Sequence, residues 1–535
     1  MTQNLVALET ALWSSADSLR GKMNASDYMN YLLGLVFFKH LSDKQLRYVG
    51  ELTGHNLESL DALQEFYTEK EQNEHEEYLE IISELKDTYA FSLAPNQTFN
   101  YLLQQIQDSN FQLDMLKSVF QYIEHSHPDL HGIFEDFDVT SSKLGTDQTQ
   151  KNKTISEVMV SIGRIDTTLE GTVDNLGDVY EYLLGKFASD NNGGEFYTPK
   201  SVSDLMSRIV TLGQEGISGF KIADFTMGSG SLMLNAKKYM SDTVFRDILY
   251  YGQELNGATY NLAKMNLILH GIPLSNQDLN RGDTLGDNWT LEGDDYEMDA
   301  VVMNPPYSLS WDASPHLLND IRFQDFGVLP PKSKADLAFL LHGLSHLKDN
   351  GKMAIVLPHG VLFRGASEGK IRQKLIENGN IEAVIGLPSN IFFNTGIPTT
   401  ILILSKSRKT KDVYFIDASQ QFEKQKAQNS MLDEHVTHIF ENYKELKEED
   451  KFSRVVPFEE IEENEFNLNI PRYIDTFEEE PEISLGNLKE ELVRVNQEID
   501  EKEKDLVGFM SEMVGDTDDL NNELQDFIAL LGGNS

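Results

Sequence analysis

The sequence contains no cysteine. Disulfide bonds, thiolate zinc sites, iron–sulfur clusters and cysteine nucleophiles are therefore excluded. Basic residues are scarce as well, because 45 Lys and Arg stand against 87 Asp and Glu, a formal net charge of −42. Nucleic acid and anionic membrane surfaces repel such a chain. A role on DNA or RNA then requires a local cationic channel or a basic partner.

Long apolar runs are also missing. The most apolar run near the N-terminus, residues 31–38, is far shorter than the roughly 20 residues that span a membrane. The first basic residue is Arg20, so we expect no signal peptide with a charged start. We expect a cytoplasmic protein with no membrane partner.

The composition nevertheless indicates folded cores and several domains. Hydrophobic residues make up 40% of the 535 residues and charged residues 25%. From about residue 4 to residue 133 the apolar spacing is helical, as at Leu32, Leu35 and Val36. The polar stretch 140–154 has no apolar periodicity and is interpreted as a linker or surface loop. We therefore predict an α-helical N-terminal domain over residues 1–155.

Residues 165 to 420 alternate short aliphatic runs with helix-period segments, which predicts an α/β fold on a mostly parallel sheet. One connecting helix has Asn256 as its predicted N-cap, an apolar face of Leu262, Met265 and Leu269, and Gly271 at its end. The ligand crevice should lie at the carboxyl ends of the strands. An α/β domain is assigned to residues 156–475, with strands predicted at 220–224, 248–251, 298–303, 352–357, 381–385, 399–404 and 413–416.

The C-terminal part is acidic and helical. Residues 441–535 hold 28 acidic and 9 basic residues, a local net charge of −19. Residues 476–535 are predicted to form a helical tail, which packs on its own domain or forms a coiled coil with another chain. Its apolar positions follow a heptad spacing: Leu485, Leu488, Leu492, Val495, Ile499, Leu506, Phe509 and Met513.

A glycine-containing segment follows the first predicted strand and opens a helix. It runs from Asp224 through Gly228, Ser229 and Gly230 to Ser231. Glycines allow the backbone to approach a ligand closely, and free N–H groups at a helix start face it. Met233 occupies the position where a dinucleotide-binding fingerprint has glycine or alanine, which argues against NAD and FAD. The alternative is a tight turn without a ligand.

Two acids lie further along the chain. Glu254 ends the next strand, where its carboxylate could accept hydrogen bonds from two ribose hydroxyls. Asp283 could accept one from an adenine amino group. Each residue also has an ordinary interpretation, as an exposed loop acid and as a turn residue respectively.

Asn304-Pro305-Pro306-Tyr307 comes directly after the strand at 298–303. The two prolines make a rigid turn, which is the ordinary interpretation. They also remove two N–H donors, which leaves carbonyls and the Asn304 oxygen as acceptors for an amine. Tyr307 adds an aromatic face for stacking. An amine held by two acceptors can aim its lone pair at an electrophilic methyl group.

The segment 195–200 has a structural explanation in part. Thr198 is predicted as an N-cap and Pro199 as the first residue of a helix running to about Ile209. Capping does not explain the aromatic residues before them. His125, His127 and His131 lack a suitably spaced acid, so we expect no metal.

These motifs, in this order along the chain, resemble those of the modification (M) subunit of type I restriction-modification systems, which are S-adenosylmethionine-dependent N6-adenine DNA methyltransferases. The similarity covers most of the chain. It is carried by Glu195-Phe196-Tyr197-Thr198-Pro199, Gly228-Ser229-Gly230, Glu254, Asp283 and Asn304-Pro305-Pro306-Tyr307. Phe225 departs from the pattern, because many relatives have proline there.

The resemblance implies a role for each matching residue. Asn304 and the Pro305 carbonyl would hold the target amine of an adenine flipped out of the duplex, and Tyr307 would stack on it. Glu254 would bind the ribose of the cofactor and Asp283 its adenine. The remaining cofactor-binding residues, around the methionine part, would be Glu195, Phe196, Tyr197, Thr198, Pro199, Lys200, Asp224, Gly228, Ser229, Gly230 and Ser231.

The resemblance also implies partners. Only acidic and helical sequence follows the last predicted strand near Ile416, so no element is left to recognise bases. A separate specificity subunit would supply that function, with two copies of this chain on it and a restriction subunit also able to join. Two alternatives remain open: a methyltransferase acting on protein glutamine or on RNA adenine, and a non-catalytic acidic scaffold.

Overall fold

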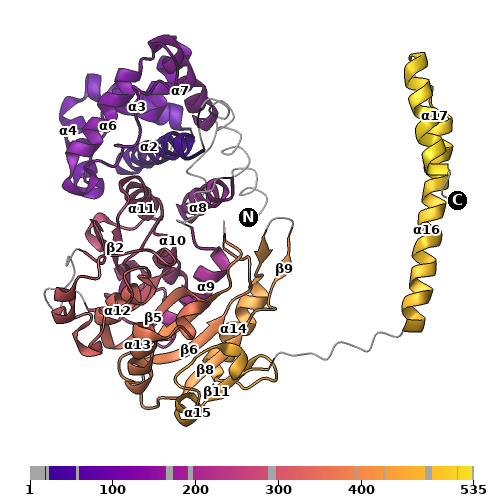
Figure 1. Cartoon of the computed structure of the whole chain (residues 1–535). Coiled ribbons are helices and arrows are strands. Elements are labelled where there is room, and N and C mark those ends of the chain that lie inside the picture. The colour runs from indigo at the N-terminus through magenta and orange to yellow at the C-terminus, as the bar shows by residue number, and fades with distance from the viewer. Residues whose placement is uncertain are drawn as a thin grey trace. The chain divides into compact units, whose positions relative to one another are not determined.

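The structure is a computed structural model (Figure 1). It describes Leu19, Met23 and residues 25–55, 59–163, 173–190, 197–286, 297–392, 395–425, 428–475, 485–514 and 516–532. The chain divides into two compact units, Met1–Asp475 and Thr476–Ser535. The further division of the first unit at residue 155 stays a prediction.

Helices form the N-terminal part of the first unit. Their bounds are α2 Ala25–Leu52, α3 Leu60–Asn73, α4 His75–Tyr89, α5 Phe99–Gln107, α6 Leu113–Ser126, α7 Gln148–Gly163 and α8 Val173–Asp190. The apolar faces of α2, α5, α6, α7 and α8 share one core, to which Leu32, Phe38, Phe120 and Val158 belong. Helices α3 and α4 pack with the end of α2 in a second, smaller core. The α-helical N-terminal region is as predicted.

The linker predicted at 140–154 is wrong in its second half. Helix α7 already begins at Gln148, and it buries Thr154 and Ile155. The first turns of α7 are polar because they face solvent, and its apolar face starts only near Ile155. The polar composition therefore concealed the start of the helix, and the predicted boundary at 155 lies inside α7.

The rest of the first unit is built on a sheet of order β11-β8-β6-β7-β5-β4-β1-β2-β3. Strands β3, β2, β1, β4 and β5 are parallel neighbours, and β7 lies antiparallel between β5 and β6. The mostly parallel α/β fold is therefore confirmed. The bounds are β1 Lys221–Asp224, β2 Leu249–Glu254, β3 Gln277–Arg281, β4 Met298–Met303, β5 Leu347–Pro358, β6 Ile381–Gly386, β7 Thr399–Leu404, β8 Val413–Asp417 and β11 Ser453–Val456.

Each predicted strand overlaps an observed one, but β3 and β11 were not predicted. Both lie at the edges of the sheet, and β3 is polar and only half-buried, so neither has the apolar run of a central strand. The expectation that only helical sequence follows Ile416 is wrong, because β11 pairs with β8 and a short β9–β10 pair, Glu423–Lys424 and Asn429–Ser430, precedes it.

Helices cover both faces of the sheet. Ile222 of β1 belongs to the core shared with α9, α10, α11 and α14, whereas the next residue, Ala223, belongs to the core shared with α12, α13 and α15. This alternation is expected for a strand that is buried on both sides. The bounds are α9 Lys200–Thr211, α10 Ser231–Leu234, α11 Gly257–Leu269, α12 Asp336–Ser345, α13 Ala366–Glu377, α14 Asp433–Glu445 and α15 Phe458–Glu463.

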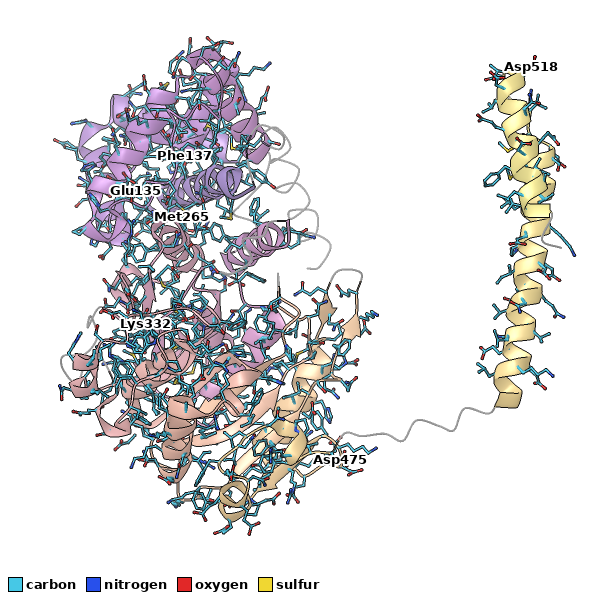
Figure 2. All side chains as sticks on the ribbon, viewed as in Figure 1. Glu135, Phe137, Met265, Lys332, Asp475 and Asp518 are labelled. Atoms are coloured by element: carbon cyan, nitrogen blue, oxygen red, sulfur yellow. The ribbon has the colours of Figure 1, made fainter. Side chains whose placement is uncertain are left out.

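Helix α11 joins the two parts of this unit (Figure 1). As predicted, the Asn256 side chain caps it by accepting a hydrogen bond from the Thr259 N–H at 3.1 Å. Leu262, Met265 and Leu269 enter the core of the N-terminal helices, to which Phe137 also belongs (Figure 2). Ala263 and Leu267 of the same helix pack toward the sheet.

The second unit consists of α16 Leu485–Ser511 and α17 Asp518–Gly532. The predicted heptad positions lie on α16 except Met513, which follows its end. Their side chains are exposed, with Leu492 at 55% and Ile499 at 48%; the side chain of Leu485 lies outside the described residues. Across the described ranges, no helix has the length and apolar character needed to cross a membrane.

Candidate functional site

A cavity of about 510 Å³ lies at the carboxyl ends of β1, β2 and β4. This is where a parallel α/β sheet is expected to bind its ligand. The cavity brings together residues from all five of the predicted motifs, although 106 positions separate Thr198 from Asn304 in the sequence. The predicted residues that line it are Thr198, Asp224, Gly228, Ser229, Ser231, Glu254, Asp283, Asn304 and Pro306.

The glycine loop between β1 and α10 forms one wall of the cavity. Gly228 and Gly230 have φ values of +53° and +77°, a region that L side chains rarely adopt. A Cβ atom on Gly230 would also lie 2.9 Å from Leu267 Cδ1. Asn266 of α11 donates a hydrogen bond from Nδ2 to the Ser229 carbonyl at 3.0 Å, which holds the loop from behind. Gly230 shapes the loop without lining the cavity.

Glu254 is the last residue of β2, and its side chain is hydrogen-bonded to this loop. Its Oε2 accepts a hydrogen bond from the Gly228 N–H at 3.1 Å, and its Oε1 accepts one from the Asn256 N–H at 2.8 Å. Burial raises the pKa of Glu254, and the hydrogen bonds from backbone N–H groups oppose that shift. Each carboxylate oxygen keeps a lone pair for a ligand hydroxyl.

Asp224, at the end of β1, is a second acid in the cavity. Burial raises its pKa to about 7, with a further contribution from nearby Glu254, while hydrogen bonds from Thr226 oppose the shift. Asp283 is a third acid there, and its Oδ1 accepts a hydrogen bond from the Leu285 N–H at 3.0 Å. Three carboxyl groups in one cavity favour a ligand with a positive charge.

Asn304 faces the same cavity from the end of β4, and both ends of its amide are hydrogen-bonded. Its Nδ2 donates to Thr198 Oγ1 at 3.0 Å, and the Tyr307 hydroxyl donates to its Oδ1 at 2.9 Å. Pro306 lines the cavity, whereas Pro305 is buried and Tyr307 half-buried beside it. The Tyr307 ring packs edge-on against Phe392, with centroids 6.2 Å apart. Burial raises the pKa of Tyr307, so its hydroxyl is neutral.

The segment before α9 only partly follows the prediction. Thr198 lines the cavity, but Tyr197, Pro199 and Lys200 do not. Glu195 and Phe196 lie outside the described residues. The N-cap prediction for Thr198 is wrong, because Pro199 occupies the cap position and no side chain caps the helix. The Thr198 hydroxyl instead contacts Asn304, a partner that local sequence could not reveal.

Several cavity residues were missed. Leu255 and Leu309 are exposed leucines at its mouth, with 68% and 43% of their surface accessible. Their only sequence signal is that each closely follows a predicted site residue. Phe225, the departure from the family pattern, is fully buried, and its ring packs against His342 and His346. Its carbonyl accepts a hydrogen bond from the Thr284 hydroxyl at 2.5 Å, and both residues line the cavity.

Nothing in the sequence indicated that Arg322 supports the site. Its guanidinium is buried, pairs with Asp320 at 2.7 Å and donates to the carbonyls of Thr284 and Leu285. It thereby ties the long segment after Tyr307 to the turn that carries Asp283. In the described part of the chain, no group of three or more His, Asp or Glu could hold a metal ion.

The sheet order and the loop at the end of β1 define a methyltransferase-like fold. The family model described as N-6 DNA Methylase matches residues 171–482, and the model described as HsdM N-terminal domain matches residues 8–162. The chain belongs to the N-6 DNA methylase family and, within it, to the methylase subunits of type I restriction enzymes. The resemblance inferred from the motifs is therefore confirmed, and with it the expectation of a DNA methyltransferase.

Individual relatives span nearly the whole chain. The type I restriction enzyme MpnII methylase subunit of Mycoplasma pneumoniae is 33% identical and covers 96% of this chain and 97% of its own. The MjaVIII methylase subunit of Methanocaldococcus jannaschii is 33% identical over 94% of this chain and 84% of its own. A solved type I restriction-modification methyltransferase subunit from Streptococcus thermophilus is 50% identical, with a TM-score of 0.86 over 88% of this chain and 100% of that chain.

Proposed function

We propose that this chain transfers a methyl group from S-adenosylmethionine to the N6 amine of adenine in a specific DNA sequence. One observation carries the proposal above all: a single cavity combines an acidic wall behind a glycine loop with the Asn304 amide at its other side. The first feature suits a cationic nucleoside cofactor and the second suits an amine substrate.

The residues present fit S-adenosylmethionine. The Gly228–Ser231 loop would lie against its methionine part, Glu254 would accept hydrogen bonds from its ribose hydroxyls, and Asp283 would accept one from its adenine. The positive sulfonium supplies the electrophilic methyl group. Asp224 and Glu254 favour that positive charge, because both carboxyl groups line the cavity.

Asn304 is proposed to hold the substrate amine. Its Oδ1 accepts from Tyr307 and keeps a second lone pair, so it can accept an N–H of the amine as well. The Pro305 carbonyl would accept the other N–H, and Tyr307 would stack on a base flipped out of the duplex. The role of the protein is to orient the nitrogen lone pair, and the amine can lose its proton after the transfer.

Recognition of DNA is proposed to need a second subunit. A chain with a net charge of −42 gains little from phosphate neutralisation, the interaction that supplies most non-specific DNA affinity. We propose that a specificity subunit docks partly on the exposed stripe of α16, that two copies of this chain join it, and that a restriction subunit can add to the assembly. The exposed Leu488, Leu492, Val495 and Ile499 would supply apolar surface for that contact.

The test is a methylation assay on the chain co-purified with its native partners. Chromosomal DNA from a strain lacking the chain is incubated with S-adenosylmethionine, and its nucleosides are analysed by mass spectrometry. N6-methyladenine at one defined sequence is expected, and Asn304→Ala should abolish it while cofactor binding persists. N4-methylcytosine, or transfer of the methyl label to protein or RNA instead of DNA, would contradict the proposal.

A further inference from the structure

The Thr198 hydroxyl is not needed by the helix that follows it. Helix α9 begins at Lys200, and the N–H groups of Val202 and Ser203 both donate to the Pro199 carbonyl at 3.0 Å. The hydroxyl lies instead 3.0 Å from Nδ2 of Asn304, a residue 106 positions away in the sequence. A contact between such distant segments, inside the cavity that both residues line, calls for an explanation other than helix capping.

With this contact, three side chains are joined in a row by hydrogen bonds. Thr198 accepts from one end of the Asn304 amide and Tyr307 donates to the other. An asparagine side chain can rotate about two bonds, and its oxygen must face an amine in order to accept from it. Hydrogen bonds at both ends hold the plane of the amide before the substrate arrives. Such preorganisation is a large part of what a protein contributes to a transfer reaction.

We propose that Thr198 is a positioning residue that orients the Asn304 amide toward the substrate amine. The inference rests on the proposed function and deepens it, because it gives Thr198 a role on the amine side of the cavity. The family resemblance had implied a role only around the methionine part of the cofactor. The two roles make different predictions for cofactor affinity and for turnover.

The experiment compares Thr198→Val with Thr198→Ser in the chain co-purified with its partners. Valine has nearly the same shape as threonine but cannot accept the Asn304 N–H, whereas serine keeps the hydroxyl. Thr211→Val is the matched control: it removes a buried hydroxyl from the helix that follows Thr198, one that donates to the Ser207 carbonyl at 2.8 Å, away from the cavity. Calorimetry measures S-adenosylmethionine affinity, and transfer of a labelled methyl group to unmethylated chromosomal DNA measures kcat and KM.

Thr198→Val should lower kcat by about 10- to 100-fold, the usual effect of a misplaced reacting group, and leave the Kd for S-adenosylmethionine within about twofold. Thr198→Ser should restore most of the turnover, and Thr211→Val should leave it unchanged. Two results would overturn this inference and leave the proposed function standing. One is unchanged turnover in Thr198→Val, and the other is a loss of cofactor affinity that accounts for the whole loss of turnover. If the wild-type complex transfers no methyl group to DNA, the proposed function fails and this inference fails with it.

Discussion

Oε2 of Glu254 accepts a hydrogen bond from the backbone N–H of Gly228 at 3.1 Å, which joins the end of β2 to the loop after β1. The carboxylate therefore has two roles: it holds the loop in place, and it presents its remaining lone pairs to the cavity. Removing it should disturb both. The proposed cofactor site can be tested at this position without altering a glycine of strained conformation.

Glu254→Ala should weaken S-adenosylmethionine binding by about 10- to 100-fold, because hydrogen bonds to a charged group contribute roughly 1.5–3 kcal/mol. Isothermal calorimetry measures the change. Glu423→Ala is the control, since Glu423 is exposed and lies on β9, away from the cavity. Wild-type affinity in Glu254→Ala would exclude this residue from the cofactor site.

Cofactor affinity should depend on pH through Asp224. Burial raises the pKa of Asp224 to about 7, so its carboxyl group is protonated at pH 6 and becomes ionised as the pH rises to 8. Ionisation adds a negative charge beside the cationic sulfonium, so affinity for S-adenosylmethionine should increase by about tenfold over this range.

The control ligand is S-adenosylhomocysteine, which lacks the methyl group on sulfur and therefore has an uncharged sulfur. Its affinity should change much less over the same pH range, and Asp224→Asn should flatten the profile of S-adenosylmethionine. If the affinities of the two ligands changed equally with pH, the pH dependence would belong to a group other than Asp224.

Two replacements of Tyr307 should distinguish the contribution of its ring from that of its hydroxyl. Tyr307→Ala removes the stacking surface, worth about 1–3 kcal/mol per base, and should mainly weaken binding of the flipped adenine. Tyr307→Phe keeps the ring but loses the hydrogen bond to Asn304, so it should lower kcat with little change in DNA affinity. A fluorescent base analogue at the target position reports flipping, and single-turnover transfer reports the chemistry. If both variants lost base flipping and methyl transfer to the same extent, the ring and the hydroxyl would not have separate roles.

Leu269→Ala should destabilise the first unit by about 2–5 kcal/mol, because it leaves a cavity where α11 meets the core of the N-terminal helices. The urea midpoint of unfolding, followed by circular dichroism, measures the loss. Leu79→Ala, at a leucine that is 52% exposed, should cost less than about 0.5 kcal/mol. Similar shifts in the two variants would mean that α11 does not anchor the N-terminal helices.

Leu492→Asp combined with Ile499→Asp should release the specificity subunit and end DNA methylation, while the chain still binds S-adenosylmethionine. Each apolar side chain contributes roughly 1.5–3 kcal/mol when buried, and a buried aspartate adds a desolvation cost. Gln497→Asp with Ser511→Asp is the matched control, because it adds the same charge to exposed positions of α16 off the stripe. Co-purification and a methylation assay measure the outcome. Normal assembly of the Leu492 and Ile499 variant would place the docking surface elsewhere.

The sequence allowed prediction of a residue's place in the cavity wherever that place depends on the residue's own strand. Asp224 and Glu254 end strands with a clear apolar pattern, Asn304 directly follows another, and parallel strands bring their carboxyl ends to one edge. The N-cap prediction for Thr198 was wrong because its local pattern suits a helix cap, whereas its partner is distant in the sequence. Strand β3 and the start of α7 were missed because edge strands and solvent-facing turns lack an apolar signal.

Helix α11 contacts two cores at once, and this limits how its sequence can change. Leu262, Met265 and Leu269 face the N-terminal helices, Ala263 and Leu267 face the sheet, and Asn266 holds the loop of the candidate site. Few of its positions remain exposed to solvent. Random substitutions should therefore accumulate much more slowly in this helix than in α16, where nearly every side chain faces solvent.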